Sequence, residues 1–108
     1  QDHGTNVDIA IPYQSSDEEY LTKLDAEFTP RIAEFKPEII FWEFGYDATS
    51  GDYGSKGLTP DCHPKIARIV NRAAEDVCQG RMVAILCGGS RRDIAHYCIP
   101  RVINCLAE

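Results

Sequence analysis

Apolar residues gather in three short segments of the chain that are rich in β-branched and aromatic side chains. The first segment, Val7–Ile11, alternates in places and ends at Pro12, which predicts a short strand. The second and third segments, 38–44 and 82–87, are nearly continuous apolar runs. Runs of this kind are typical of strands buried on both faces, as in a parallel sheet. The pattern therefore predicts three strands in one parallel sheet.

Between and after these strands, apolar residues recur at the spacing of an amphipathic helix. The predicted helices cover residues 17–35, the segment from Pro60 to about Cys78, and the segment after Ser90 to about Leu106. Each helix begins at a candidate cap. The candidate caps are Ser15–Asp17, Thr59, and Ser90 paired with Asp93 as in a capping box.

The predicted order is strand-helix-strand-helix-strand-helix. This alternation predicts a three-layer α/β fold, in which right-handed crossovers place helices on both faces of a parallel sheet. We expect the 108 residues to form a single domain, 1–108, with a modest core. A three-stranded sheet leaves edges that need cover, either from more polypeptide or from a homo-oligomer. The chain begins at Gln1 rather than Met, which favours an excerpt of a longer polypeptide or a processed protein.

Composition and charge exclude several classes of protein. The chain is 44% apolar and 26% charged, as soluble globular proteins are. A net charge of −6 and a pI near 5.0 argue against direct binding of nucleic acid or of a membrane surface, since both favour basic faces. No apolar run approaches the roughly 20 residues of a membrane span. We therefore expect neither nucleic acid nor membrane as a partner.

The cysteines indicate the cellular compartment. There are five, an odd number, with no C-x-x-C pair and with mostly apolar neighbours. This pattern predicts buried, reduced thiols in a cytoplasmic protein, and its spacing does not suit a zinc cluster.

Asp47 is the candidate functional residue, because it follows the end of the 38–44 strand after Gly45. Sites in open parallel sheets lie at the carboxyl ends of strands. Asp47 is therefore either a metal ligand or a carboxylate that accepts backbone N–H bonds within its own turn. A long glycine-rich loop, 45–58, follows, in which Asp52 is expected to organise the turn with Gly51. A second turn, Gly88–Ser90, precedes a predicted helix and can bind an anion there, although capping also explains it.

Several blocks of the sequence, in order, resemble the histone deacetylase family, which includes acetoin-utilisation proteins and acetylpolyamine amidohydrolases. The first blocks are Asn6–Pro12, Asp17–Leu21 and Phe35–Ile40. The segment Phe44-Gly45-Tyr46-Asp47-Ala48, with Gly51-Asp52 and Leu58-Thr59, is similar to the family pattern S-A-G-F-D-A-x-x-G-D followed by L-T. Leu86-Cys87-Gly88-Gly89 is similar to the family turn L-x-G-G-Y, with Ser90 in the position of the tyrosine. The resemblance covers essentially the whole chain.

This resemblance implies the C-terminal part, incomplete by itself, of a zinc-dependent amidohydrolase of arginase-like α/β fold that removes acetyl groups from lysine or polyamine-like amines. In that family an Asp-x-His pair and a second aspartate hold the zinc, and only the second aspartate is present here, as Asp47. The family pocket maps onto Gly45, Gly88 and Gly89. The other ligands and the paired histidines lie upstream of the family block where this chain starts. The spacing of Asp2-His3-Gly4 does not fit the ligand pair, which makes His3 an ordinary terminal histidine.

Ser90 is the main departure from the family, because a serine hydroxyl ends several ångströms short of a tyrosine hydroxyl. Loss of one oxyanion donor lowers rates by on the order of a hundredfold or more. The enzyme then uses another stabiliser, such as Arg91 or Arg92, or its activity is weakened. The alternative is a non-catalytic α/β domain that retains the scaffold for interaction or oligomerisation. His63 is expected on the surface in either case.

Overall fold

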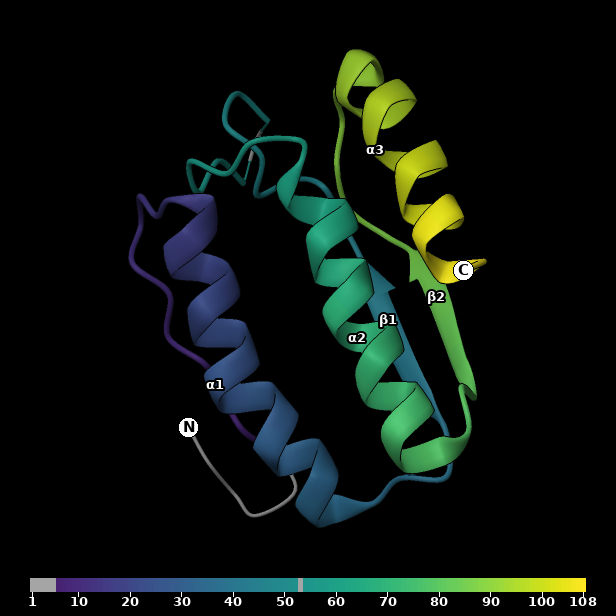
Figure 1. Cartoon of the computed structure of the whole chain (residues 1–108). Coiled ribbons are helices and arrows are strands. Elements are labelled where there is room, and N and C mark those ends of the chain that lie inside the picture. The colour runs from purple at the N-terminus through teal and green to yellow at the C-terminus, as the bar shows by residue number, and fades with distance from the viewer. Residues whose placement is uncertain (1–5, 53) are drawn as a thin grey trace.

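The computed structural model describes residues 6–52 and 54–108, and it shows an α/β fold with a parallel sheet (Figure 1). Its elements are α1 (Asp17–Phe35), β1 (Ile40–Phe44), α2 (Cys62–Cys78), β2 (Met82–Leu86) and α3 (Arg92–Leu106). The bounds of α1 match the prediction, and the two continuous apolar runs form the strands. None of the described helices is long and apolar enough to cross a bilayer. His3 lies outside the described residues.

The two strands pair in parallel, with Ile40 opposite Met82 at one end and Phe44 opposite Leu86 at the other. A parallel pair cannot be joined by a tight turn, so the chain crosses over through α2 before it returns as β2. Both strands consequently leave the sheet at the same edge. The candidate site forms at this edge.

The segment Val7–Ile11 is not a strand, so the predicted first strand is wrong. The chain runs beside α1 here (Figure 1), and Val7 and Ile9 line a hollow of about 710 Å³ together with Phe28 and Ile32 of α1. Alternating apolar residues form a strand only where a neighbouring strand is available for packing and pairing. Here the apolar side chains lie against a helix instead. In the described residues the order is therefore helix-strand-helix-strand-helix.

Helices cover only one face of the sheet, so the predicted third layer is wrong for the described residues. α2 lies between α1 and α3, in front of the strands in Figure 1. Ile40 and Phe44 are buried on this helical side. Phe41, Val83 and Ile85 point the other way, because side chains alternate along a strand, and they are 62%, 43% and 45% exposed. We call these three residues the open face.

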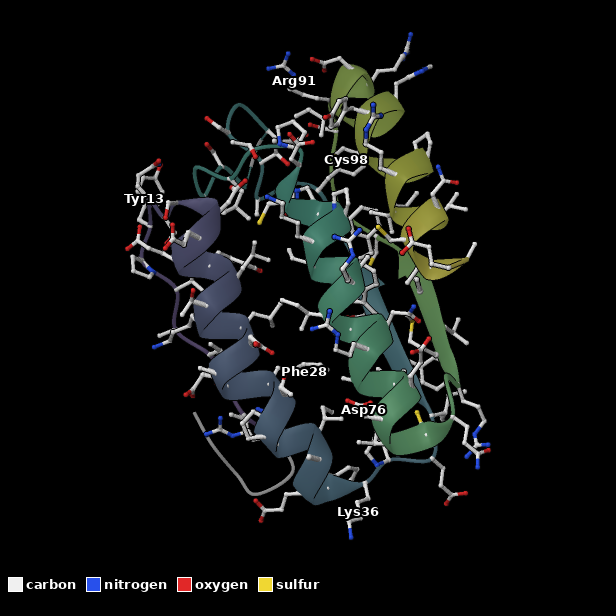
Figure 2. All side chains as sticks on the ribbon, viewed as in Figure 1. Tyr13, Phe28, Lys36, Asp76, Arg91 and Cys98 are labelled. Carbon is white, nitrogen blue, oxygen red and sulfur yellow. The ribbon has the colours of Figure 1, made fainter. Side chains whose placement is uncertain are left out.

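α2 is the central element of the core, because two clusters of buried side chains share it. The first cluster joins α2 to α1 and β1, and the second joins α2 to α3 and the end of β1. The first consists of Ile40, Leu58, Cys62, Ile66, Val70, Ala74 and Cys78. The second consists of Phe44, Tyr46, Ala67, Ile94, Cys98, Val102 and Cys105. Phe28 of α1 and Cys98 of α3 lie on the sides that face α2 (Figure 2).

The cysteines serve the core as small apolar side chains. All five are free thiols, and four are buried as predicted, with Cys87 exposed. Burial raises the pKa of Cys62 to about 12 and that of Cys98 to about 11. Both thiols therefore stay protonated at neutral pH and are poor nucleophiles.

The start of α1 is capped as the sequence predicts. Ser16 Oγ accepts a hydrogen bond from Glu19 N at 3.1 Å, and Ser16 N donates to Glu19 Oε1 at 3.0 Å, which completes a capping box. The predicted Thr59 cap is wrong, because α2 begins only after Asp61. The Thr59 hydroxyl instead donates to the Asp17 carboxylate, and this bond joins the β1–α2 loop to the first turn of α1.

We predict that Ser16→Ala lowers the free energy of unfolding by about 1 kcal/mol, because the capping box loses its acceptor for an otherwise unpaired helical N–H. Urea denaturation of the purified chain measures this difference. Ser50→Ala is the matched control: Ser50 is exposed, and only its backbone N–H is hydrogen-bonded. An equal loss in both variants would show that the cap contributes nothing specific.

Candidate functional site

The candidate site lies where β1 and β2 leave the sheet, and backbone hydrogen bonds keep the two exits together. Cys87 N donates to Phe44 O at 2.7 Å, and Tyr46 N donates to Gly88 O at 3.4 Å. The parallel pairing thus continues one step beyond the strands. It brings Asp47, which follows Tyr46, beside the Gly88–Ser90 turn, as the strand-end position of Asp47 predicts.

Three glycines surround the Asp47 carboxylate. A Cβ atom at Gly54 would lie 2.8 Å from Asp47 Oδ2, and one at Gly45 or Gly88 would lie 2.9 or 3.0 Å from Oδ1. The closest atoms to the Cβ positions at Gly45 and Gly54 are backbone oxygens, Cys87 O at 2.4 Å from the first and Asp47 O at 2.7 Å from the second, so another residue at either position would displace backbone as well as the carboxylate. Gly88 also has a φ of 100°, a conformation that L residues rarely adopt. The three glycines therefore allow the backbone of both strand exits to pack closely around Asp47.

No described residue donates a hydrogen bond to the half-buried Asp47 carboxylate. Among the described residues, no hydrogen bond supports the interpretation in which Asp47 ties down its own turn. Backbone bonds hold that turn instead, from Thr49 N to Tyr46 O at 3.1 Å and from Lys56 N to Ala48 O at 2.8 Å.

Asp47 does not form a complete metal site with the rest of the described chain. Among residues 6–52 and 54–108, no group of three or more His, Cys, Asp or Glu side chains is placed to hold a metal ion. Zinc takes three or four protein ligands. A zinc ion bound by Asp47 would therefore need donors from outside the described residues.

The glycine turn after β2 packs against an aromatic ring. A Cβ at Gly89 would lie 2.4 Å from the ring of Tyr46, a buried residue that immediately precedes Asp47. Gly88 and Gly89 therefore let this turn approach both the ring and the carboxylate. These close contacts explain why glycines occupy two of the three predicted pocket positions.

Ser90 is tied to the β1–α2 loop rather than to its own helix. Its hydroxyl donates to Asp52 Oδ1 at 3.0 Å, while its backbone N–H lies 3.1 Å from both Asp52 oxygens. The predicted Ser90–Asp93 capping box is wrong: Arg91 is the N-cap of α3, without a side-chain cap, and Asp93 pairs with the Arg91 guanidinium at 2.9 Å. Figure 2 shows Arg91 at the start of α3. The carboxylate of Asp52 therefore occupies the predicted anion position.

His63 is buried, so its predicted surface position is wrong. Its side chain is 2% exposed, its Nε2 lies 2.7 Å from Thr49 Oγ1, and its ring meets Phe44 edge-on. Burial lowers the pKa of His63, and the carboxylates of Asp17 and Asp47 oppose this shift. The helical spacing of His63 with Ile66, Ala67 and Val70, all buried, is the signal that places it on the inner side of α2.

Comparison with known proteins identifies the family. A family model for the histone deacetylase domain matches residues 1–106, and the chain therefore belongs to the histone deacetylase family. It is 36% identical over 87 residues to a probable deacetylase of Archaeoglobus fulgidus, a match that covers 80% of this chain. It is 26% identical over 102 residues to histone deacetylase 8 of Arabidopsis thaliana, and this alignment covers 94% of this chain.

Solved structures share the fold. The histone deacetylase Clr3 matches 94% of this chain with a TM-score of 0.75 and 22% identity, and the HDA15 HD domain matches 86% with a TM-score of 0.71 and 25% identity. These alignments cover 16% and 26% of the two solved chains. The chain likewise spans 24% and 27% of the two curated relatives. It corresponds to part of a histone deacetylase domain.

We predict that His63 makes the stability of the chain depend on pH. Because the folded pKa of His63 is lowered, the unfolded chain binds a proton there more readily than the folded chain does. The free energy of unfolding should therefore fall as the pH drops below about 6.5, the unperturbed value for histidine. His63→Gln should remove this part of the pH dependence, as measured by urea unfolding at about pH 7.5 and about pH 5.5.

His96→Gln is the matched control for this experiment, because His96 lies exposed on α3. It should leave the pH dependence as it is in the unchanged chain. If both variants lose the same amount of stability on acidification as the unchanged chain, His63 is not the responsible group.

Proposed function

We propose that this chain supplies part of a zinc-dependent amidohydrolase, with Asp47 as one of the zinc ligands. The proposed reaction removes acetyl groups from lysine or from polyamine-like amines. Family membership supports the class of reaction. The observation that carries the role of Asp47 is its carboxylate at the strand exit, surrounded by three glycines and without a hydrogen-bond donor among the described residues.

The donor chemistry of Asp47 suits zinc, which binds carboxylate oxygens together with imidazole nitrogens. When bound, the zinc would polarise the acetyl carbonyl and activate water for attack. The part of this chain is to orient the Asp47 carboxylate through the paired strand exits. Gly45, Gly88 and Gly89 keep the wall of the proposed pocket free of side chains. The Asp-x-His ligands and the paired histidines would come from outside the described residues.

The hydroxyl of Ser90 limits what this residue can contribute to catalysis. A hydroxyl has one proton to donate, and that of Ser90 is directed at Asp52. To stabilise an oxyanion, Ser90 would first have to leave Asp52. We therefore propose that the oxyanion is stabilised by another group or more weakly than by a tyrosine. The salt bridge to Asp93 also directs the Arg91 side chain to its own helix.

We predict that Asp47→Ala weakens zinc binding by more than about a hundredfold in the full product of the gene that encodes this chain, because a direct ligand is removed. The protein is purified without chelator. Its zinc content is measured by plasma mass spectrometry, and its zinc dissociation constant by competition with a chelating dye. Release of acetate from an acetyl-lysine peptide should fall in parallel.

Asp76→Ala provides the control, since Asp76 is exposed on α2. It should bind zinc as the unchanged protein does. Full zinc occupancy in Asp47→Ala would contradict the proposed ligand role. Zinc binding without any release of acetate would contradict the proposed reaction.

The open face supports a second candidate function, a surface that binds another polypeptide. Phe41 pairs with Val83, and Ile85 follows on the same face opposite the exposed Glu43, so the three apolar side chains form a patch with one carboxylate at its border. Monomeric proteins rarely leave large patches of this kind in water. We propose that a second copy of the chain covers the open face when no other polypeptide does.

In this proposal residues 1–108 act as one structural unit in the cytoplasm, with no nucleic-acid or membrane partner.

We predict that the 108-residue chain self-associates at micromolar concentration and that Ile85→Lys shifts it toward the monomer. A charged side chain at this position makes burial of the open face unfavourable. Sedimentation velocity measures the change. Ile103→Lys is the matched control, because Ile103 is 58% exposed but lies on α3 rather than on a strand. A monomer at all concentrations, or an equal effect of both substitutions, would contradict self-association through the open face.

A further inference from the structure

We infer that Asp52 is a positioning residue, whose carboxylate holds the Gly88–Arg91 turn against the loop that carries Asp47. This inference rests on the function proposed above, because it concerns the geometry of the same zinc site. It assigns Ser90 to that same contact, as a partner of Asp52 rather than as a donor to the substrate.

The contact between Asp52 and the turn is buried and multiple. Asp52 is 4% exposed, although its neighbour Gly51 lies at the surface. Its carboxylate accepts from Arg91 N at 2.9 Å, from Ser90 N at 3.1 Å and from Ser90 Oγ at 3.0 Å. Each bond is charge-assisted, and two of the donors are backbone groups just before α3, where the helix dipole favours a negative charge.

The other end of this connection is anchored to α2. Asp52 N donates to Thr49 O at 3.0 Å, and Ser55 N donates to Asp52 O at 3.1 Å, so the backbone around Asp52 is fixed within its loop. Thr49 is itself buried and lies 2.7 Å from the buried ring of His63. The turn after β2 is thus linked through Asp52 and Thr49 to the first turn of α2.

This link adds to the contacts that hold the glycines beside Asp47, which include the bond from Tyr46 N to Gly88 O. Gly88 lies two residues before Ser90. It is so close to Asp47 that a Cβ atom added at Gly88 would lie 3.0 Å from Asp47 Oδ1. Gly88 has no side chain, so only contacts of the backbone and of neighbouring residues fix its position beside Asp47. With Ser90 and Arg91 fixed by Asp52, the turn keeps its distance from the carboxylate of Asp47. Without that anchor, the glycine turn gains freedom and the orientation of Asp47 is less defined.

A carboxylate suits this contact better than a neutral amide does. Its two oxygens accept all three donors at once. Asparagine would offer one acceptor oxygen and place an NH₂ group against a backbone N–H. Asp52→Asn should therefore keep the size of the side chain but lose part of the contact, while Asp52→Ala loses all of it. The two variants form a graded series.

Amide hydrogen exchange on the 108-residue chain tests the contact without any metal. In Asp52→Ala, protection of the Ser90 and Arg91 amides should fall by roughly ten- to a hundredfold, the change expected when a bond to a charged acceptor is lost. In Asp52→Asn, the protection of these two amides should lie between that of the unchanged chain and that of Asp52→Ala. The Cys87 amide, which donates to Phe44 O, is the internal reference and should stay protected. Unchanged protection of Ser90 and Arg91, or equal loss at Cys87, would overturn the inference.

Zinc affinity in the full product of the gene tests the positioning role. Asp52→Ala should weaken zinc binding by about ten- to a hundredfold, as outer residues that orient a ligand commonly do. At saturating zinc it should lower kcat more than it changes KM. Ser90→Ala should have a smaller effect, since the two backbone donors to Asp52 remain. Asp76→Ala should match the unchanged protein.

Two results separate the failure of this inference from the failure of the proposed function. If Asp47→Ala loses zinc but Asp52→Ala binds it with unchanged affinity, Asp52 has no positioning role and the proposed function stands. If Asp47→Ala keeps its zinc, the proposed ligand is wrong and the positioning role falls with it. The hydrogen-exchange result then describes a structural contact only.

Discussion

Five residue pairs in parallel register between β1 and β2 bring the elements of the candidate site together. The pairing requires a crossover, and α2 supplies it, so one helix serves both as the connection and as the centre of two core clusters. The same pairing brings both strand exits to one edge. Asp47 leaves one strand there, and the glycine turn leaves the other. Every contact of the candidate site depends on this shared edge.

Features set by neighbouring residues could be predicted from the sequence, and features set by distant ones could not. The bounds of α1 follow from its own capping box and apolar spacing. The strand at Val7–Ile11 needed a partner that the described chain does not offer, and the three-layer arrangement needed cover for the open face. The Ser90 cap failed for a similar reason: its real partner, Asp52, lies 38 residues away in the sequence.

The site itself was predicted in part. The position of Asp47 at a strand exit follows from the apolar pattern, and its likeness to a zinc ligand follows from the family motif. Gly54 and His63 were not assigned to the site, because their contacts with Asp47 and Thr49 arise only after the loop folds back. The periodic apolar positions of α2 do contain the signal for His63. No local pattern contains the signal for the Asp52–Ser90 contact.

The connection from His63 through Thr49 and Asp52 to Ser90 has a consequence for local opening of the fold. The residues between Asp52 and Ser90 include all of α2 and β2, so this contact closes only after both elements are in place. Long-range closure of this kind carries an entropic cost that local helix formation does not. The Asp52–Ser90 contact is therefore expected to be among the last to form and among the first to open, before the paired strands separate. Such opening would disorganise the site while the helices stay intact.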